Sequence, residues 1–347
     1  MAADWQLMLR WQLLLLAACA FVGHALRRAQ APVIAVLAMP EFKPPPWQAK
    51  RSYIAASYVK WLEAHGARVV PLLYDAPRSE TTQLLSQVNG VLFPGGAFPM
   101  EPEYEAFSRF VFNQSLSHKI PAWGECLGLL QFLLYTSGQD SPGPVTDGWD
   151  ARGPLISPVH LTTAGMKQGP MAKFPAELLE GIQNQPWAWH SHAYSTSVEA
   201  FEASPSMVAF WDVLAIDEDR RGHPFISIIA AKDFPVTATM FHPEKNSFEF
   251  MPARVTGTDI PEAARSSAAM DAMSHLGFYF LDQCRSFREH SFSQQELMTW
   301  NIHNWAPEHT APKDSVFEEI YFFPARNTAP RPAMTGNQQP LSHWGSF

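Results

Sequence analysis

Short apolar runs alternate with amphipathic segments over residues 32–136, and this alternation restricts the fold more than any other feature of the chain. The apolar runs have the length and residue types of buried strands, and they span 32–38, 67–73, 90–94 and 119–123. The segments between them carry apolar residues at helical spacing, and they span 51–65, 79–88, 101–117 and 127–136. The pattern predicts an α/β fold: an open, mostly parallel sheet flanked by helices, with the site at the carboxyl ends of the strands.

After residue 150, strand patterns follow one another without long helices between them. Four of them span 153–162, 205–216, 224–232 and 234–242, and they predict hairpins added to the sheet. Helical spacing returns at 262–288, so we expect one domain over 32–288. Residues 289–347 then form a C-terminal extension rich in proline, histidine and asparagine. Its one apolar burst, Val316–Phe323, is expected to pack as a final strand or a helical turn.

The N-terminus indicates the compartment. An apolar run over 11–23 follows Arg10, and it is short for a membrane span but long enough for the core of a signal peptide. Small residues at Gly23 and Ala25 fit a cleavage site, so we expect residues 1–25 to be a signal peptide. The alternative is an uncleaved anchor, because the basic pair at 27–28 outnumbers Arg10.

Cysteine usage agrees with a secretory route. Cleavage would remove Cys19 and leave Cys126 and Cys284, too few for a disulfide framework. An unpaired thiol in an oxidising compartment is either buried and inert or used chemically. The sequon at Asn113 predicts a glycosylation site. We therefore expect a glycoprotein of the lysosome, the vacuole or the extracellular space.

Charge and motifs exclude several kinds of partner. The chain has 25 Lys and Arg against 33 Asp and Glu, a formal net charge of −8, which argues against a generic grip on nucleic acid. No phosphate-binding loop is present, and the pair His190 and His192 lacks a third metal ligand at suitable spacing. We expect no metal, no cofactor and, once the signal is cleaved, no stable membrane insertion.

The segment Gly124–Gly128 carries the chemistry. A predicted strand runs into it and a predicted helix runs out, so Cys126 would sit on a sharp turn of the nucleophile-elbow type. The helix N-terminus would stabilise a thiolate, and the N–H of Leu127 would face a developing oxyanion. Gly95 and Gly96 end another strand and offer further N–H donors. Alternatively, Cys126 is a small buried apolar residue and the glycines serve packing.

The partner base is predicted at His242. If this segment is extended, Glu244 projects to the same side as His242 and can fix the imidazole tautomer. A Cys, His, Glu order along the chain is acceptable because triads are defined in space. A lone His-x-Glu is weak evidence, but together with the elbow it indicates a nucleophile, base and orienting carboxylate.

These motifs resemble those of gamma-glutamyl hydrolases, also called folylpolyglutamate hydrolases, within the flavodoxin-like class I glutamine amidotransferase-like fold. The resemblance covers about residues 32–288 and rests on five segments in the family's order, at 53–63, 66–71, 89–96, 123–128 and 242–245. The first of them, which contains YIAASYVK, is particular to these hydrolases. By this resemblance Cys126 is the nucleophile, His242 the base and Glu244 its orienting carboxylate.

The chain also departs from the family's pattern. Glu125 stands where these hydrolases usually carry Thr or another small residue, and a carboxylate there would repel substrate or raise the thiol pKa if it faced Cys126. The family has a substrate-side histidine within the stretch 187–194, where either His190 or His192 fits. The alternative for that stretch is a surface loop with incidental histidines.

Three function classes follow. The first is a cysteine peptidase-type hydrolase that cleaves gamma-glutamyl amide bonds, such as those of folate poly-gamma-glutamates, through a thioester and without a cofactor. The second is a glutaminase-type amidotransferase domain, and the third is a non-catalytic relative that binds a ligand. For the first we expect a small-molecule gamma-glutamyl substrate and allow for a homodimer.

Overall fold

The computed structural model describes residues 31–41, 51–250, 260–288, 291–311 and 316–325. The predicted signal peptide and Cys19 lie outside these residues. Within the described part of the chain, no helix combines the length and apolarity that a bilayer crossing requires.

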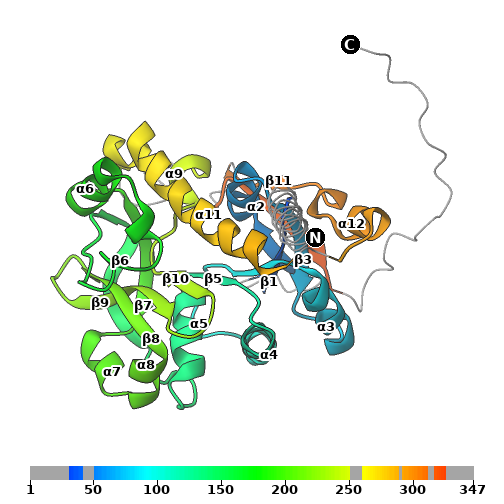
Figure 1. Cartoon of the computed structure of the whole chain (residues 1–347), viewed down its shortest axis with the longest axis horizontal. Helices are drawn as coiled ribbons and strands as arrows, with labels where there is room; N and C mark the ends of the chain where they lie inside the picture. Colours follow the sequence, from blue (N-terminus) through cyan, green and yellow to red (C-terminus); the bar gives the residue numbers. More distant parts are fainter. Residues whose placement is uncertain (1–30, 42–50, 251–259, 289–290, 312–315, 326–347) are drawn as a thin grey trace, which may run out of the picture.

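A parallel sheet forms the centre of the molecule, as the sequence predicts (Figure 1). Parallel pairing joins β3 to β1, β1 to β4, β4 to β5 and β5 to β10, whose bounds are Val33–Pro40 (β1), Arg68–Leu73 (β3), Gly90–Phe93 (β4), Ala122–Glu125 (β5) and Val236–Thr239 (β10). Continuous apolar runs such as that of β1 suit strands covered on both faces. The carboxyl ends of β4, β5 and β10 meet at one edge, where the candidate residues lie.

Helices cover both faces of this sheet. Those on one face are Ala56–Ala64 (α2) and Ser267–Phe287 (α11), whose apolar side chains pack in one buried cluster with Trp123. Those on the other face are Arg78–Gln87 (α3), Pro102–Ser117 (α4) and Leu127–Thr136 (α5). Figure 1 shows α2 and α11 on the opposite side of the strands from α4 and α5. Because both of its faces are buried, the parallel part of the sheet is rigid enough to hold a site.

Antiparallel strands extend the sheet beyond β10, as predicted. They are Trp211–Glu218 (β8) and Pro224–Ala231 (β9). Two other strands, Thr146–Ser157 (β6) and Ala188–Ser195 (β7), form a separate two-stranded sheet instead. The strand predicted over 205–216 is wrong in its first half, which is helix α8 (Pro205–Phe210). Ser204 caps that helix and Pro205 occupies its first turn, and these local signals outweigh the apolar pattern.

The helix predicted over 51–65 is also wrong at its start. Residues Arg51–Ala55 form strand β2, and only from Ala56 is the chain helical. Strand β2 pairs with Glu319–Pro324 (β12), which in turn pairs with Glu308–His309 (β11). The apolar burst near the C-terminus is therefore a strand, and residues after 288 add strands to the sheet of the main domain. Such a long-range pairing leaves no local trace in the sequence.

Further elements lie between these strands or after α11. They are the helices Ala176–Asn184 (α6), Val198–Glu202 (α7), Lys245–Phe248 (α9) and Gln294–Trp300 (α12), and the short 3-10 turns Met171–Lys173, Glu262–Arg265 and Ile302–Asn304. The sequence patterns did not predict α6, α7, α9, α12 or β7.

Candidate active site

Cys126 occupies the turn between β5 and α5 in a strained conformation. Its φ is 51° and its ψ is −100°, a left-handed region that non-glycine residues rarely adopt. A Cβ on Gly128 would lie 2.4 Å from the carbonyl oxygen of Phe93, so this position needs glycine. The Cys126 N–H donates to Thr239 O of β10 over 2.8 Å. Strand, tight turn and helix together form a nucleophile elbow.

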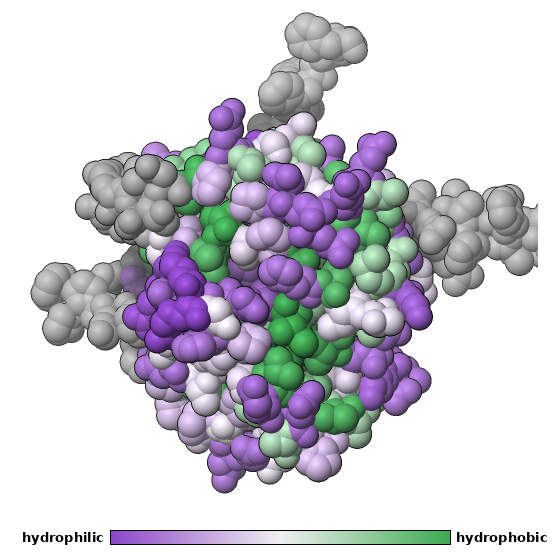
Figure 2. All heavy atoms as spheres, turned by 90° about the vertical axis from the view of Figure 1, so that its left-hand side faces the viewer, coloured by the Kyte–Doolittle hydropathy of each residue, from purple (hydrophilic) through white to green (hydrophobic). Residues whose placement is uncertain are grey.

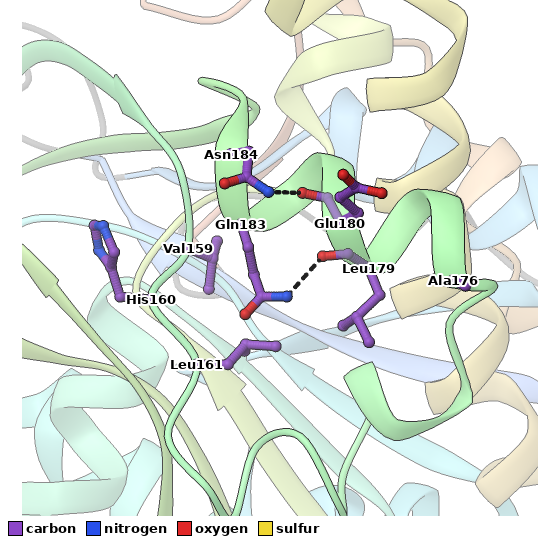
Figure 3. Close-up of a pocket in the computed structure, with 8 residues that line it drawn as sticks. All are labelled: Val159, His160, Leu161, Ala176, Leu179, Glu180, Gln183 and Asn184. Atoms are coloured by element: carbon purple, nitrogen blue, oxygen red, sulfur yellow. Dashed lines mark hydrogen bonds between the residues drawn. The ribbon is translucent and has the colours of Figure 1, made fainter.

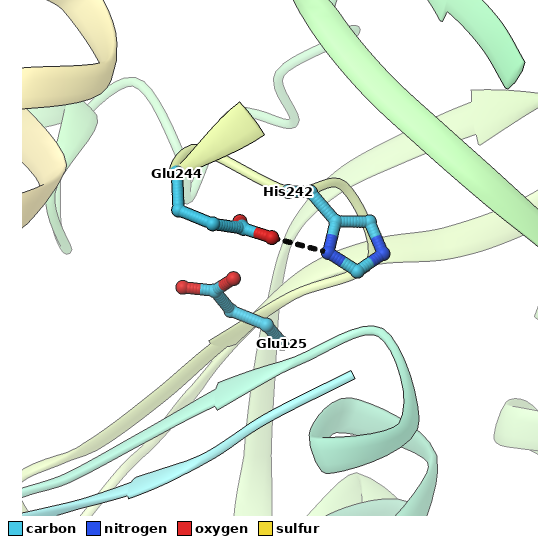
Figure 4. Close-up of side chains that lie close together, drawn as sticks. All are labelled: Glu125, His242 and Glu244. Carbon is cyan, nitrogen blue, oxygen red and sulfur yellow. Dashed lines mark hydrogen bonds and ion pairs between the residues drawn. The ribbon is translucent and has the colours of Figure 1, made fainter. Parts of the chain in front are cut away.

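His242 and Glu244 follow the end of β10. The sequence prediction of an extended backbone is wrong here. Glu244 is in the right-handed helical region, with φ −69° and ψ −25°. The turn nevertheless brings His242 Nδ1 to 3.0 Å from Glu244 Oε1 (Figure 4). His242 N–H also donates to Trp189 O over 2.9 Å, which ties the turn to β7. Both side chains are buried.

The backbone of Gly95 lies between the histidine and the cysteine. A Cβ built on Gly95 would be 2.5 Å from His242 Cε1 and 3.3 Å from Cys126 Cβ. Any side chain at Gly95 would therefore displace the imidazole. The structure thus brings Cys126, His242 and Glu244 together around one glycine at the carboxyl ends of β4, β5 and β10.

Two of the three predicted oxyanion donors interact with groups of the site. The Leu127 N–H lowers the pKa of the Cys126 thiol, and the Gly95 N–H donates to the Tyr58 hydroxyl over 2.8 Å. A Cβ on Gly96 would lie 3.0 Å from Leu127 Cδ2, so this second glycine adjoins the elbow. A substrate oxygen would have to take over the Leu127 and Gly95 donors on binding.

Tyr58 is a further site residue, and the sequence motifs do not single it out. It lies on α2, within the family-like segment 53–63, and its hydroxyl is 3.4 Å from His242 Nδ1. Burial, followed by the negative charge of Glu244, raises the pKa of Tyr58 well above its usual value. A neutral hydroxyl thus accepts from Gly95 and lies beside the imidazole. The only available signal was the position of this tyrosine in the segment particular to the hydrolases.

Burial dominates the electrostatics of the nucleophile. It raises the pKa of Cys126 to about 12, and the Leu127 N–H and the Lys245 ammonium lower it only partly. The expectation of a thiolate stabilised by the helix N-terminus is therefore wrong for the free protein, because desolvation of a charged sulfur outweighs the helix. The cysteine is a neutral thiol at neutral pH.

The base and its carboxylate are tuned in the same surroundings. Burial lowers the pKa of His242 although Glu244 raises it, so the imidazole is ready to accept a proton. Burial raises the pKa of Glu244, but the attraction of His242 and Lys245 outweighs it and lowers that pKa to about 2. Glu244 therefore stays ionised and can orient the imidazole.

Glu125, the residue before the nucleophile, does not face the thiol. Its Oε1 accepts from Trp123 Nε1 over 2.8 Å, and its carboxyl group lies beside Glu244 (Figure 4). Among the described residues, Glu125, His242 and Glu244 have ligand atoms within 4.8 Å of one another, close enough for a metal ion. Since His242 Nδ1 and Glu244 Oε1 already bond to each other, we assign the group to proton positioning.

His190 and His192 lie in strand β7 and are buried, so the surface-loop interpretation is wrong. Two residues apart on a strand, they share one face, with ring centroids 5.7 Å apart. His190 Nε2 is 3.6 Å from Asp217 Oδ2, and His192 Nδ1 is 3.1 Å from Tyr194 O. Burial lowers the pKa of His190 to about 4 and that of His192 well below its usual value. Both rings are neutral and lie on the strand that adjoins His242.

Other surface features lie apart from this centre. Asn113 is exposed on α4, while the sequon's Ser115 is buried and its hydroxyl donates to Val111 O over 2.9 Å.

A surface pocket of about 490 Å³ (Figure 3) lies between α6 and the stretch 159–161, and none of the site residues lines it. On the face seen in Figure 2, hydrophilic groups surround and interrupt the apolar side chains.

A comparison with known families defines the class of this protein. Residues 52–255 match the family model described as glutamine amidotransferase class-I. The chain is thus a class I glutamine amidotransferase-type domain, in agreement with the mostly parallel sheet and the elbow.

The individual relatives define the family within that class. The chain is 30% identical over 280 residues to gamma-glutamyl hydrolase B of Dictyostelium discoideum, covering 78% of this chain and 77% of the relative. It is 31% identical over 277 residues to gamma-glutamyl hydrolase of Bos taurus, covering 78% and 83%. A solved Trypanosoma brucei CTPS glutaminase domain with bound acivicin is 14% identical with a TM-score of 0.45, covering 76% and 97%. The chain belongs to the gamma-glutamyl hydrolase family and is an enzyme of that type.

Proposed function

We propose that this enzyme cleaves gamma-glutamyl amide bonds of folate poly-gamma-glutamates with a Cys126, His242, Glu244 triad. The observation that carries the proposal is the placement of the strained elbow cysteine and the His242 to Glu244 pair on either side of Gly95. Nucleophile, base and orienting carboxylate in that arrangement are the components of acyl transfer through a covalent intermediate.

The reaction has two halves. In the first, the Cys126 sulfur attacks the amide carbonyl carbon while its proton passes to His242 Nε2, giving a tetrahedral oxyanion near Leu127 and Gly95. His242 then protonates the leaving amine, the C–N bond breaks, and a thioester remains. In the second, His242 removes a proton from water, the hydroxyl oxygen attacks the thioester, and the proton returns to the sulfur.

The buried thiol determines the timing of proton transfer. With a pKa raised to about 12 by burial, Cys126 is not ionised before substrate arrives. The thiol must therefore lose its proton to the neutral His242 during the attack itself. Glu244 stabilises the imidazolium that forms, since it is ionised and 3.0 Å from Nδ1.

We further propose that His190 or His192 faces the bound substrate. Both rings lie on β7, whose Trp189 carbonyl accepts from His242, and both are neutral donors or acceptors in a buried site.

The family resemblance and the N-terminal sequence support a secretory enzyme that acts in the lysosome, the vacuole or outside the cell. Glycosylation at Asn113 and a homodimer remain expectations of the same proposal.

One experiment tests the function directly. Purified protein is incubated in parallel with folate pentaglutamate and with glutamine, and both chain length and ammonia are measured. Shortened folate chains without ammonia support the proposal. Ammonia from glutamine as the main product would favour a glutaminase, and no product from either would favour a non-catalytic relative.

Cysteine variants provide the matched control. Cys284 is the other cysteine of the described residues, and it is fully buried beside Gly90, away from the elbow. Cys284→Ala should cleave the folate substrate at the wild-type rate per folded molecule, whereas Cys126→Ala should not cleave it.

A further inference from the structure

Glu125 has no role in the triad, yet it is fully buried within the active site. One oxygen, Oε1, accepts from Trp123 Nε1 over 2.8 Å. The other, Oε2, has no hydrogen-bond donor among the described residues. Glu244 is similar: Oε1 is bonded to His242, and its buried Oε2 lacks a donor in the described structure. Two unsatisfied carboxyl groups thus lie side by side (Figure 4).

This arrangement is unfavourable if both groups are ionised. Two carboxylates at this separation in a buried site repel each other, and neither can donate a hydrogen bond to the other. The Lys245 ammonium offsets part of their charge, and it lies on the Glu244 side, 3.8 Å from Glu244 Oε1. The pair therefore holds one proton, as paired carboxyl groups in other active sites do.

The surroundings decide which carboxyl group holds that proton. Glu244 contacts His242 and Lys245, both of which favour its anion. Glu125 accepts from the neutral Trp123 donor, and burial followed by the charge of Glu244 raises the pKa of Glu125 well above its usual value, an effect that Lys245 offsets only in part. The proton therefore belongs to Glu125.

We propose that Glu125 is a positioning residue that stays protonated at neutral pH and donates its hydrogen to the Glu244 carboxylate. The proposal deepens the proposed function, on whose triad it rests. Trp123, Glu125, Glu244 and His242 then form one hydrogen-bonded chain, in which His242 and Glu125 hold the orienting carboxylate from two sides. A small residue at this position could not reach Glu244, so this chain uses an additional support.

Other titratable groups lie near Glu125 on the neighbouring elements. They are Tyr58 on α2, Cys126 on the elbow, and His242, Glu244 and Lys245 after β10. Tyr58 and Cys126 are both neutral at physiological pH because burial raises the pKa of each. All of these groups are present in both wild type and E125Q, so a pH-dependent difference in stability between the two proteins reports the protonation of Glu125.

A stability titration tests the proton without any substrate. In the unfolded chain Glu125 has its ordinary pKa of 4.5, whereas in the folded protein it stays neutral, so its contribution to wild-type stability falls as pH rises above that value. The isosteric E125Q variant lacks this loss. Its melting temperature relative to wild type should increase by about 2 °C per pH unit between about pH 5 and 7.5. A constant difference across that range would overturn the proposal.

A spectroscopic measurement covers the case in which E125Q does not fold. Wild-type protein at pH 7 should show the infrared carbonyl band of a neutral carboxylic acid. This band should persist in E249Q, the control that removes a second buried carboxyl group, whose Oε2 accepts from the Glu318 N–H. A spectrum without any such band would contradict a protonated Glu125.

Activity then tests the positioning role. E125Q keeps a donor toward Glu244 and an acceptor for Trp123, so its kcat should fall less than threefold; E125L keeps neither, and its kcat should fall more than tenfold with little change in KM. Equal rates for E125Q and E125L would show that Glu125 does not support Glu244.

Failure of the proposed function can be distinguished from failure of this inference. If no protein, wild type included, cleaves a gamma-glutamyl substrate, the proposed function fails and so does the positioning role. The stability titration still shows whether Glu125 holds the proton.

Discussion

Two turns carry the catalytic residues, and different contacts hold each of them in place. The elbow carries Cys126, and the turn after β10, here called the base turn, carries His242 and Glu244. Cys126 is placed mainly by its sequence neighbours, a strand, a strained residue and a helix within 122–136, with one backbone hydrogen bond to Thr239 O of β10. His242 is placed by other parts of the chain, namely the Trp189 carbonyl, the Tyr58 hydroxyl and the space left by Gly95. The nucleophile is thus a local structure, whereas the base depends on tertiary contacts.

This difference has consequences for the chemistry. The elbow fixes the position of the sulfur but leaves it neutral, because burial raises the pKa of Cys126 to about 12. The base turn supplies the charge that the elbow lacks, since Glu244 is ionised and supports the imidazolium. Substitutions at the elbow should therefore abolish activity without disturbing the fold. Substitutions around the base turn should lower kcat by an amount that depends on which contacts of His242 and Glu244 they remove.

The largest effect is expected at the nucleophile. Cys126→Ser should lower kcat by about a thousandfold or more while the melting temperature stays near wild type, because a hydroxyl beside the same base is far less nucleophilic than a thiol. Steady-state kinetics and thermal denaturation measure the two. Near-full turnover by the serine variant would show that Cys126 is not the nucleophile.

Variants of the base turn should fall in a fixed order. His242→Ala removes proton transfer and should cost about 10³-fold in kcat, whereas Glu244→Gln removes only the orienting charge and should cost about 10²-fold. Rates are compared at saturating substrate. Unimpaired rates for both variants would contradict the triad, and a more severe effect of Glu244→Gln would contradict the division of roles.

Two glycine variants separate packing from chemistry. A Cβ at Gly95 would lie 2.5 Å from His242 Cε1, and one at Gly90 would lie 2.4 Å from Cys284 Sγ. Gly95→Ala should lower kcat up to about 10²-fold by displacing the imidazole. Gly90→Ala should lower the melting temperature but keep kcat within twofold per folded molecule. A Gly90→Ala variant as inactive as Gly95→Ala would point to general misfolding.

The smallest effect concerns the charge next to the nucleophile. Wild-type Cys126 should react with iodoacetamide about a thousandfold more slowly at pH 8 than an ordinary thiol, and the rate should rise into the alkaline range because the raised pKa keeps the thiolate scarce. Since Glu125 faces Glu244, Glu125→Thr should change this labelling rate less than threefold. A large acceleration would mean that Glu125 acts on the thiol after all.

The same contrast explains what the sequence could predict. The strands and helices of 67–136 and the elbow at Cys126 follow from local patterns. The proximity of His242 and Glu244 was also predicted, but from an extended backbone, whereas a turn brings them together. The start of α2, strand β7 and the role of Tyr58 do not, because they depend on β12, on the second sheet and on the position of Gly95. The raised pKa of the Cys126 thiol does not follow from the sequence for a similar reason: the helix N-terminus is visible in the sequence, but the degree of burial is not.

The most direct test of the account is to trap the covalent intermediate. Wild-type protein is mixed with folate pentaglutamate, quenched in acid within milliseconds to seconds, digested and examined by mass spectrometry, with Cys284→Ala and Cys126→Ala treated alike. The account predicts a glutamyl thioester on the peptide that carries Cys126 in wild type and in Cys284→Ala, but none in Cys126→Ala. Product formation by Cys126→Ala at the wild-type rate, or an acyl group on any other residue, would contradict it.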